Sequence, residues 1–356
     1  MKSLATLNEA AKVAIRDVMG LREGEEVLII TNFEGEVFPI AKALFDETKA
    51  LGGKPVMMVQ GMKTIYDYAE RLIYEGIKAE PDIYVSMSAN KLGKDAYGMN
   101  IGYVGRDGKK YKSYVDKLMD GDKRLRGFWS PTANVAMFER CVAVDYEAMQ
   151  ANAARLKKVL DAGKEVHVTS PGGTDVTISV EGRKAMADDG NFRLPGLGGN
   201  LPAGETFVSP VVGSTKGVIV FDGTIDLPEK ALIPKTPVRV SFKDGYVDKI
   251  TGGEEAAALL NVILKGEAMA REKCLPEEEK NARHLGELGI GINYQAKMSG
   301  NLLEDEKVGK TVHFAIGSNY DYDAEALIHQ DCLVLRPSMW VDGKQIMKNG
   351  DLLDTF

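Results

Sequence analysis

Histidine is rare in this sequence, and most of it lies near the C-terminal end. Of four histidines among 356 residues, three (His284, His313 and His329) follow residue 283 and lie near acidic residues in apolar segments. In the run 329–331, His329 and Asp331 are two residues apart, which places an imidazole and a carboxylate on one face of an extended strand. The pair can therefore bind one metal ion, although a surface strand with two outward-facing polar side chains would show the same pattern.

Two of the polar residues in this region interrupt strongly apolar segments. His313 lies within the apolar run 311–317, and Glu287 lies within the glycine-rich apolar run 286–291. Burying an unpaired imidazole or carboxylate is costly, so each side chain must have a partner. A hydrogen bond in the core for His313, and an ion pair with Arg283 or another base for Glu287, are the structural alternatives to metal binding.

Glu205 and Tyr320 are weaker candidates when each is considered alone. Glu205 follows a loop rich in proline and glycine at 194–204 and begins a strand, a common position for a functional residue carried on a rigid scaffold. Tyr320 lies in a polar loop, seven residues after His313. Alone, the first would be interpreted as a solvated glutamate and the second as a surface tyrosine.

Together these segments resemble a known enzyme family. The motifs GNLPAGE at 199–205, LGELG at 285–289, HFAIG at 313–317 with Tyr320, and HQD at 329–331 are similar, in this order, to those of thermophilic-type metallo-aminopeptidases of the aminopeptidase T and aminopeptidase S kind. The similarity is clearest over residues 199–345. It implies a homodimer and a pair of divalent metal ions, with these ligands: Glu205, Glu287, His313, Tyr320, His329 and Asp331.

The chemistry of such a site is consistent with peptide hydrolysis. Three carboxylates and two divalent ions leave a residual positive charge, which favours a metal-activated water as the nucleophile. Oxygen and nitrogen ligands without a thiolate suit zinc, cobalt or manganese. Glu205 and Glu287 are the candidate catalytic carboxylates for moving a proton to the leaving amine, and full commitment of both to metal is the alternative.

His284 supports a different enzyme class. Together with His329 and Asp331 it would supply two imidazoles and one carboxylate, the ligand triad of non-haem iron oxygenases. Ring-cleaving 2,5-dihydroxypyridine dioxygenases resemble distant relatives of the same peptidase fold, so the resemblance also permits a single Fe(II) ion held by these three residues. A buried or surface histidine with no metal is the structural alternative.

The sequence predicts two kinds of structure that must position these residues. Strands at 27–30, 55–59, 82–87 and 126–129 alternate with helices such as 37–51, which predicts a doubly wound parallel α/β sheet. After a helix at 146–160, we expect hairpins at 165–180 and 238–250, a helix at 254–273 and strands at 288–292, 312–316 and 333–335. We therefore predict an α/β domain over 1–185, and a mixed, β-rich α+β domain over 186–356 that carries the metal site.

Composition narrows the function classes. The chain has 44% hydrophobic and 27% charged residues and no apolar run long enough to span a membrane, so a globular protein is expected. A net charge of −7 without a Lys/Arg run argues against nucleic acid as a partner. Three widely spaced cysteines argue against a zinc-thiolate site and favour the cytoplasm. The glycines at 196–199 lack the spacing of a dinucleotide site.

The sequence thus predicts a cytoplasmic metallo-aminopeptidase, a hydrolase that removes N-terminal residues from short peptides. The alternative enzyme is a mononuclear Fe(II) ring-cleaving dioxygenase of the 2,5-dihydroxypyridine type. An inert binding or scaffold protein of the same fold is the third hypothesis.

Overall fold

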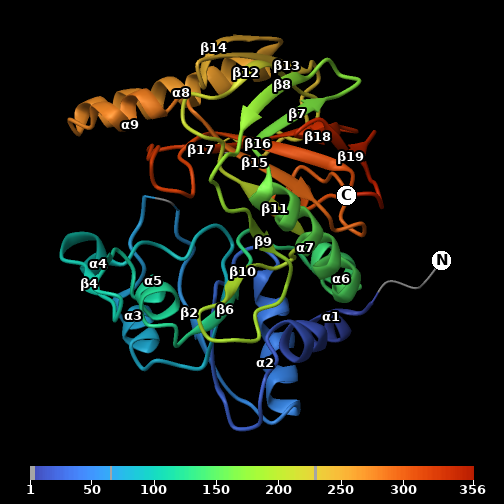
Figure 1. The fold of residues 1–356 in the computed structure, drawn as a ribbon. Helices are drawn as coiled ribbons and strands as arrows, with labels where there is room; N and C mark the ends of the chain where they lie inside the picture. The colour runs from blue at the N-terminus through green and yellow to red at the C-terminus, as the bar shows by residue number, and fades with distance from the viewer. Residues whose placement is uncertain (1–4, 65, 228–230) are drawn as a thin grey trace. The chain divides into compact units, whose positions relative to one another are not determined.

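The computed structural model describes residues 5–64, 66–227 and 231–356, and the chain forms two compact units (Figure 1). The first unit comprises Met1–Tyr146 and Gly190–Ala203, and the second comprises Glu147–Asp189 and Gly204–Phe356. The sequence predicts a single boundary at residue 185. The units instead interleave along the chain, because the strands formed by 165–179 pair within the second unit while Gly198–Asn200 pairs within the first.

The first unit contains the predicted parallel sheet. Its five strands are all parallel and follow the order β10-β6-β3-β1-β2. Their bounds are β1 Glu26–Thr31, β2 Lys54–Val59, β3 Ile83–Met87, β6 Arg126–Trp129 and β10 Gly198–Asn200. The first four confirm the predicted strands, whereas β10 lies inside a segment predicted to be a loop. This strand has only three residues, two of them glycine, so it lacks the apolar pattern typical of a strand.

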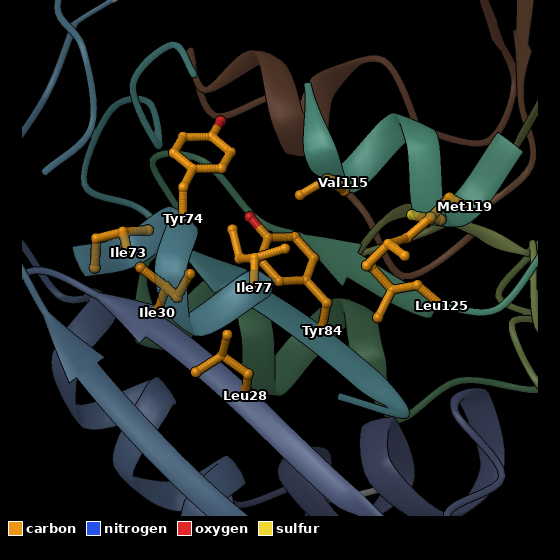
Figure 2. Packing of buried hydrophobic residues seen from close by; sticks show 10 residues of the cluster. Leu28, Ile30, Ile73, Tyr74, Ile77, Tyr84, Val115, Met119 and Leu125 are labelled. Carbon is orange, nitrogen blue, oxygen red and sulfur yellow. The ribbon is translucent and has the colours of Figure 1, made fainter. Parts of the chain in front are cut away.

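Helices pack on the strands of this sheet in two groups. One group is α1 (Leu7–Val13), α2 (Val37–Ala50) and α6 (Val135–Val142), which contact one another, and the other includes α3 (Arg71–Ile77) and α5 (Tyr114–Asp116). Figure 2 shows the core beneath the second group, where Ile73 and Ile77 face Leu28, Ile30 and the ring of Tyr84. The remaining elements of the unit are π-helical turns at Ala14–Val18 and Lys117–Gly121, α4 (Ala96–Asn100), β4 (Tyr103–Val104) and β5 (Lys110–Tyr111).

The second unit is built on two antiparallel sheets. The larger has the order β14-β13-β12-β8-β7-β18-β19-β20, with β7 Glu165–Thr169, β8 Asp175–Ser179, β12 Lys216–Phe221, β13 Val238–Lys243, β14 Tyr246–Thr251, β18 Ser338–Val341, β19 Lys344–Lys348 and β20 Asp351–Leu352. It contains both predicted hairpins. The helices of this part of the chain are α7 Tyr146–Ala162, α8 Glu254–Glu272, α9 Pro276–Asn281 and α10 Leu302–Asp305.

The smaller sheet carries the candidate site residues. Its order is β17-β16-β15-β11-β9, with β9 Met186–Asp188, β11 Glu205–Val208, β15 Leu285–Gly291, β16 Thr311–Gly317 and β17 His329–Leu335. Every residue of β15 and β16 is buried. β15 starts three residues before its predicted position and β17 starts four residues before, because a glycine and a polar run weaken the apolar pattern at their first residues.

Within the described part of the chain, no helix is both long and apolar enough to cross a membrane. Within the described chain the three cysteines form no disulfide, and Cys141 and Cys332 are buried. The predicted cytoplasmic location stays a prediction.

Candidate metal centre

Strand register brings the predicted ligands to one face of the smaller sheet. Glu287 on β15 is opposite Ala315 on β16, which in turn is opposite Asp331 on β17. Side chains alternate between the faces of a strand, so His313 lies on the same face as Ala315, and His329 on the same face as Asp331. The polar side chains therefore converge although they come from separate strands.

Small residues on this face make room for the convergence. Gly289 on β15 is directly opposite His313, and Gly291 is opposite Glu205 at the start of β11. A Cβ atom at Gly289 would lie 1.9 Å from Nε2 of His313, a distance that no side chain tolerates. The glycines that weaken the strand pattern in the sequence are thus required by the site.

Glu287 is the centre of the arrangement. Its Oε1 lies 3.3 Å from Nε2 of His313, and its Oε2 lies 3.1 Å from Nε2 of His329. Nε2 of His313 also lies 3.3 Å from Oε2 of Glu205, and Nε2 of His329 lies 3.5 Å from Oδ1 of Asp331. The five side chains form two groups that share Glu287, one with Glu205 and His313 and one with His329 and Asp331. In each group, ligand atoms lie within 4.8 Å of one another.

The donor atoms fit divalent cations. Oε2 of Glu205, Nε2 of His329 and Oδ1 of Asp331 are buried and make no hydrogen bond to any described residue. Such atoms are costly to bury without a partner, and a bound cation would supply one. Nδ1 of His329 donates to the carbonyl oxygen of Ser318 at 2.8 Å, which leaves Nε2 with its lone pair for a ligand bond.

The charges of the cluster shift the pKa values of its members. Burial raises the pKa of Glu287, but its close contacts with His313 and His329 and the charges of both imidazoles outweigh burial and lower that pKa to about 2. Burial lowers the pKa of His313, whereas Glu287 and Glu205 raise it to about 9 overall. Without a cation, the acidic cluster thus holds protons on its histidines.

Tyr320 lies at the edge of the centre. Its ring packs edge-on against His329, with 5.4 Å between ring centroids, and also contacts Phe207 at 4.9 Å. Its backbone amide donates to Oγ of Ser209 at 3.1 Å, which fixes the loop. Burial, followed by the charges of Glu287, Asp331 and Glu205, raises the pKa of the phenol. The residue as a whole is 43% exposed, and it lies at the rim of the buried ligand cluster.

Sequence reasoning missed a buried cation next to these ligands. Lys307 is 0% exposed, and its Nζ lies 2.5 Å from Oε1 of Glu205, 2.7 Å from Oε1 of Glu306 and 3.4 Å from Oδ2 of Asp188. Burial would lower the pKa of Lys307, but these carboxylates hold it well above its usual value. The run 304–307 is typical of a solvated charged turn, and Lys307 itself gives no sequence signal of burial.

The comparisons with known proteins agree on the fold. The family model described as NicX, 2,5-dihydroxypyridine 5,6-dioxygenase, matches residues 132–354. This chain belongs to the NicX family. No curated protein matches it.

Two solved structures share the fold over nearly the whole chain. The 2,5-dihydroxypyridine dioxygenase from Pseudomonas putida KT2440 has a TM-score of 0.70 at 15% identity, and covers 98% of this chain and 97% of its own. AmpT from Thermus thermophilus has a TM-score of 0.68 at 16% identity, and covers 98% of both chains. At these identities the likeness shows the fold alone. The NicX-family α/β architecture with a β-rich C-terminal part is therefore confirmed, while hydrolase and dioxygenase remain to be distinguished by the site.

His284 bears on that distinction. It is fully buried, and its ring packs edge-on against Tyr246, with 5.6 Å between centroids. Burial is the main cause that lowers its pKa to about 4. Among the described residues, neither group of possible metal ligands includes His284, and each group contains a single histidine. The predicted iron ligands His284, His329 and Asp331 are therefore not brought together as such a group.

Proposed function

We propose that this NicX-family chain is a metal-dependent hydrolase with two divalent cations, and that it acts as an aminopeptidase on short peptides. The observation that carries the proposal is the position of Glu287 between two ligand groups. A carboxylate with one oxygen toward each group is suited to bridge two cations. A single-ion site would need only one of the groups.

In this proposal each group of side chains has a defined task. Glu205 and His313 would hold one zinc, cobalt or manganese ion, His329 and Asp331 would hold the other, and Glu287 would contribute to both positions. When bound, the ions would activate water and polarise the carbonyl of the scissile peptide bond. Tyr320 closes the rim beside His329 and is proposed as the sixth ligand, because its hydroxyl is held near the same carboxylates.

The proton that must reach the leaving amine is assigned to a carboxylate. Both oxygens of Glu287 already lie against histidines, and Oε1 of Glu205 lies against Lys307. Oε2 of Glu205 makes no hydrogen bond to the described chain. In the proposed centre this oxygen would also face the ion held with His313, so Glu205 could move a proton only while Oε2 is not bound to the ion, and full commitment of both carboxylates to metal is the alternative.

A mononuclear Fe(II) ring-cleaving dioxygenase is the second candidate, and the family match favours it. The family model is named for such an enzyme, and one of the solved structures that share the fold is a dioxygenase. The side chains favour the hydrolase, because an iron triad requires two histidines and one carboxylate around a single ion. Each group here has one histidine and two carboxylates.

Metal analysis followed by two activity assays tests both candidates. Protein purified without added metal should bind two divalent ions per chain and hydrolyse peptides with a free N-terminus, and chelation should abolish the hydrolysis until zinc, cobalt or manganese is restored. One iron per chain with oxygen-dependent consumption of 2,5-dihydroxypyridine would instead establish the dioxygenase. Hydrolysis that survives exhaustive chelation would exclude the metal mechanism.

We also infer that the protein is a homodimer, on the basis of the resemblance to the metallo-aminopeptidases. Light scattering at micromolar concentration should give twice the mass of the 38.8 kDa chain. A monomer under these conditions would refute the inference.

A further inference from the structure

Lys307 is unusual because a lysine side chain is rarely buried completely. It lies between α10 and β16, and its side chain has no exposed surface. A buried ammonium group is strongly unfavourable unless charged partners compensate it. Glu205, Glu306 and Asp188 supply that compensation from three separate segments of the second unit.

The two oxygens of the Glu205 carboxylate have different neighbours. Oε1 is 2.5 Å from Nζ of Lys307, whereas Oε2 is 3.3 Å from Nε2 of His313 and makes no hydrogen bond. Lys307 therefore fixes the rotation of the carboxylate and turns one oxygen toward the group formed with Glu287 and His313. Within the described chain, Lys307 forms no ion pair with Asp331 of the second group.

Carboxylates outnumber ammonium groups around Lys307. Glu205, Glu287, Asp331 and Asp188 are buried and Glu306 is nearly buried, whereas Lys307 contacts Glu205, Glu306 and Asp188. Bound cations would compensate the carboxylates that Lys307 does not contact.

We propose that Lys307 is a positioning residue for one of the two metal ions: it holds Oε1 of Glu205, so that Oε2 points to the ion bound with Glu287 and His313. This inference rests on the proposed two-metal centre. In this inference Lys307 supports the ion position formed by Glu205, Glu287 and His313. The position formed with His329 and Asp331 does not depend on Lys307. Lys307 acts through Glu205 and does not touch the ion.

Metal content and affinity of Lys307→Met test the inference, with Lys310→Met as the matched control. Lys310 is three residues away but exposed, and it pairs with Asp351 at 2.7 Å. After dialysis at low free zinc or manganese, wild type and Lys310→Met should hold two ions per chain and Lys307→Met should hold one. Chelator competition should show an affinity loss of about 10 to 100-fold at the lost position, as is common for residues that orient a ligand.

A double variant separates positioning from charge balance and guards against a misfolded single variant. Lys307→Met with Glu306→Gln removes one positive and one negative charge, so the net charge of the cluster is unchanged. Positioning predicts that the double variant still holds one ion. Recovery of the second ion in the double variant, or two tightly held ions in Lys307→Met, would overturn the inference while leaving the proposed function intact. Wild-type protein that binds no second ion would overturn both.

Discussion

Glu287 occupies an electrostatically demanding position. It is 3% exposed, lies in a strand whose residues are all buried, and has an imidazole against each oxygen. An acidic side chain in such a position is stable only if positive charge is near it. The histidines provide this charge when protonated, and divalent cations would provide it in the active protein.

The two buried histidines should respond differently to removal. His313→Ala takes a ligand from one ion position, so we expect the metal content to fall from two ions to one and peptide hydrolysis to fall by at least 100-fold. His284→Ala should keep its metal content, because His284 belongs to neither ligand group. Metal analysis and initial rates of both variants check this. Loss of metal in His284→Ala with normal metal in His313→Ala would make the dioxygenase the better assignment.

His284 should also make stability depend on pH. Burial lowers its pKa from 6.5 to about 4 in the folded chain, with Arg183 and Lys280 adding to the shift and Asp323 opposing it. Below pH 6.5 the unfolded chain takes up a proton that the folded chain refuses until about pH 4. The free energy of unfolding is therefore undiminished above pH 6.5 and decreases as the pH falls from 6.5 to 4, by ~3 kcal/mol.

Urea denaturation of chelated protein at pH 7 and pH 4.5 measures this dependence. His284→Phe has no titrating group at this position, so its stability should decrease less over the same interval than that of wild type. Equal decreases in the two proteins would show that other groups cause the pH dependence.

Individual residues also differ in how far the sequence reveals their role. His313 and Glu287 could be found because a polar group inside an apolar strand is expensive and must have a reason. The structure brings these two together with Glu205, His329 and Asp331. Lys307 could not be found, because its three carboxylate partners come from β9, β11 and its own turn. Only the tertiary structure shows that the turn is buried.

At the scale of elements, β15 and β16 combine strand pairing with space for the site. Gly289 faces His313 across the pair, and Ala315 lies between Glu287 and Asp331. Large residues at these positions would fill the volume that the ligands and ions need. The pattern of small residues on one face is thus a property of the pair of strands rather than of either strand alone.

Gly289→Ala tests this requirement with one added methyl group. The new Cβ would lie 1.9 Å from Nε2 of His313, so the imidazole or the strand must move. We expect a loss of stability of about 1 to 3 kcal/mol, typical of overpacking, together with loss of the ion bound by His313. Gly61→Ala is the control, because a Cβ there has nothing within 4 Å. Calorimetry and metal analysis that find both variants equal to wild type would disprove the packing argument.

The sequence predicts the order of strands and helices better than their ends. Apolar runs identify β1, β2, β3 and β6, and turn residues identify the two hairpins. The sequence does not predict the first residues of β15 and β17, because Gly286 and the polar start of β17 join their strands through pairing with β16 and not through local propensity. A bulge between Leu285 and Glu287 is likewise set by the partner strand.

At the scale of the whole molecule, all described ligand candidates belong to the second unit. The first unit is built on a parallel sheet. The chain leaves this unit after Tyr146 and re-enters it at Gly190, where β10 pairs with β6. The sequence predicts an α/β region followed by a β-rich region, and the structure confirms both. The sequence could not predict that the chain re-enters the first unit, because the three residues of β10, Gly198–Asn200, do not indicate a strand.

We therefore expect bound metal to protect the second unit against local unfolding more than the first. A cation that binds the folded state tightly raises the free energy of unfolding by about 2.7 kcal/mol at a concentration 100 times its dissociation constant. Openings that expose the ligands must release the ion, so amide exchange in β11, β15, β16 and β17 should slow markedly when zinc or manganese is added to the chelated protein. Local openings in β1, β2 and β3 release no ion from the proposed centre, and exchange there should change far less.

Hydrogen exchange followed by mass spectrometry resolves these segments in one experiment. The Glu287→Gln variant is the sharpest comparison, because it removes the carboxylate that both ion positions share. Added metal should give it little protection anywhere in the chain. Protection that is equal in both units of wild type, or that persists in Glu287→Gln, would place the bound metal outside the centre described here.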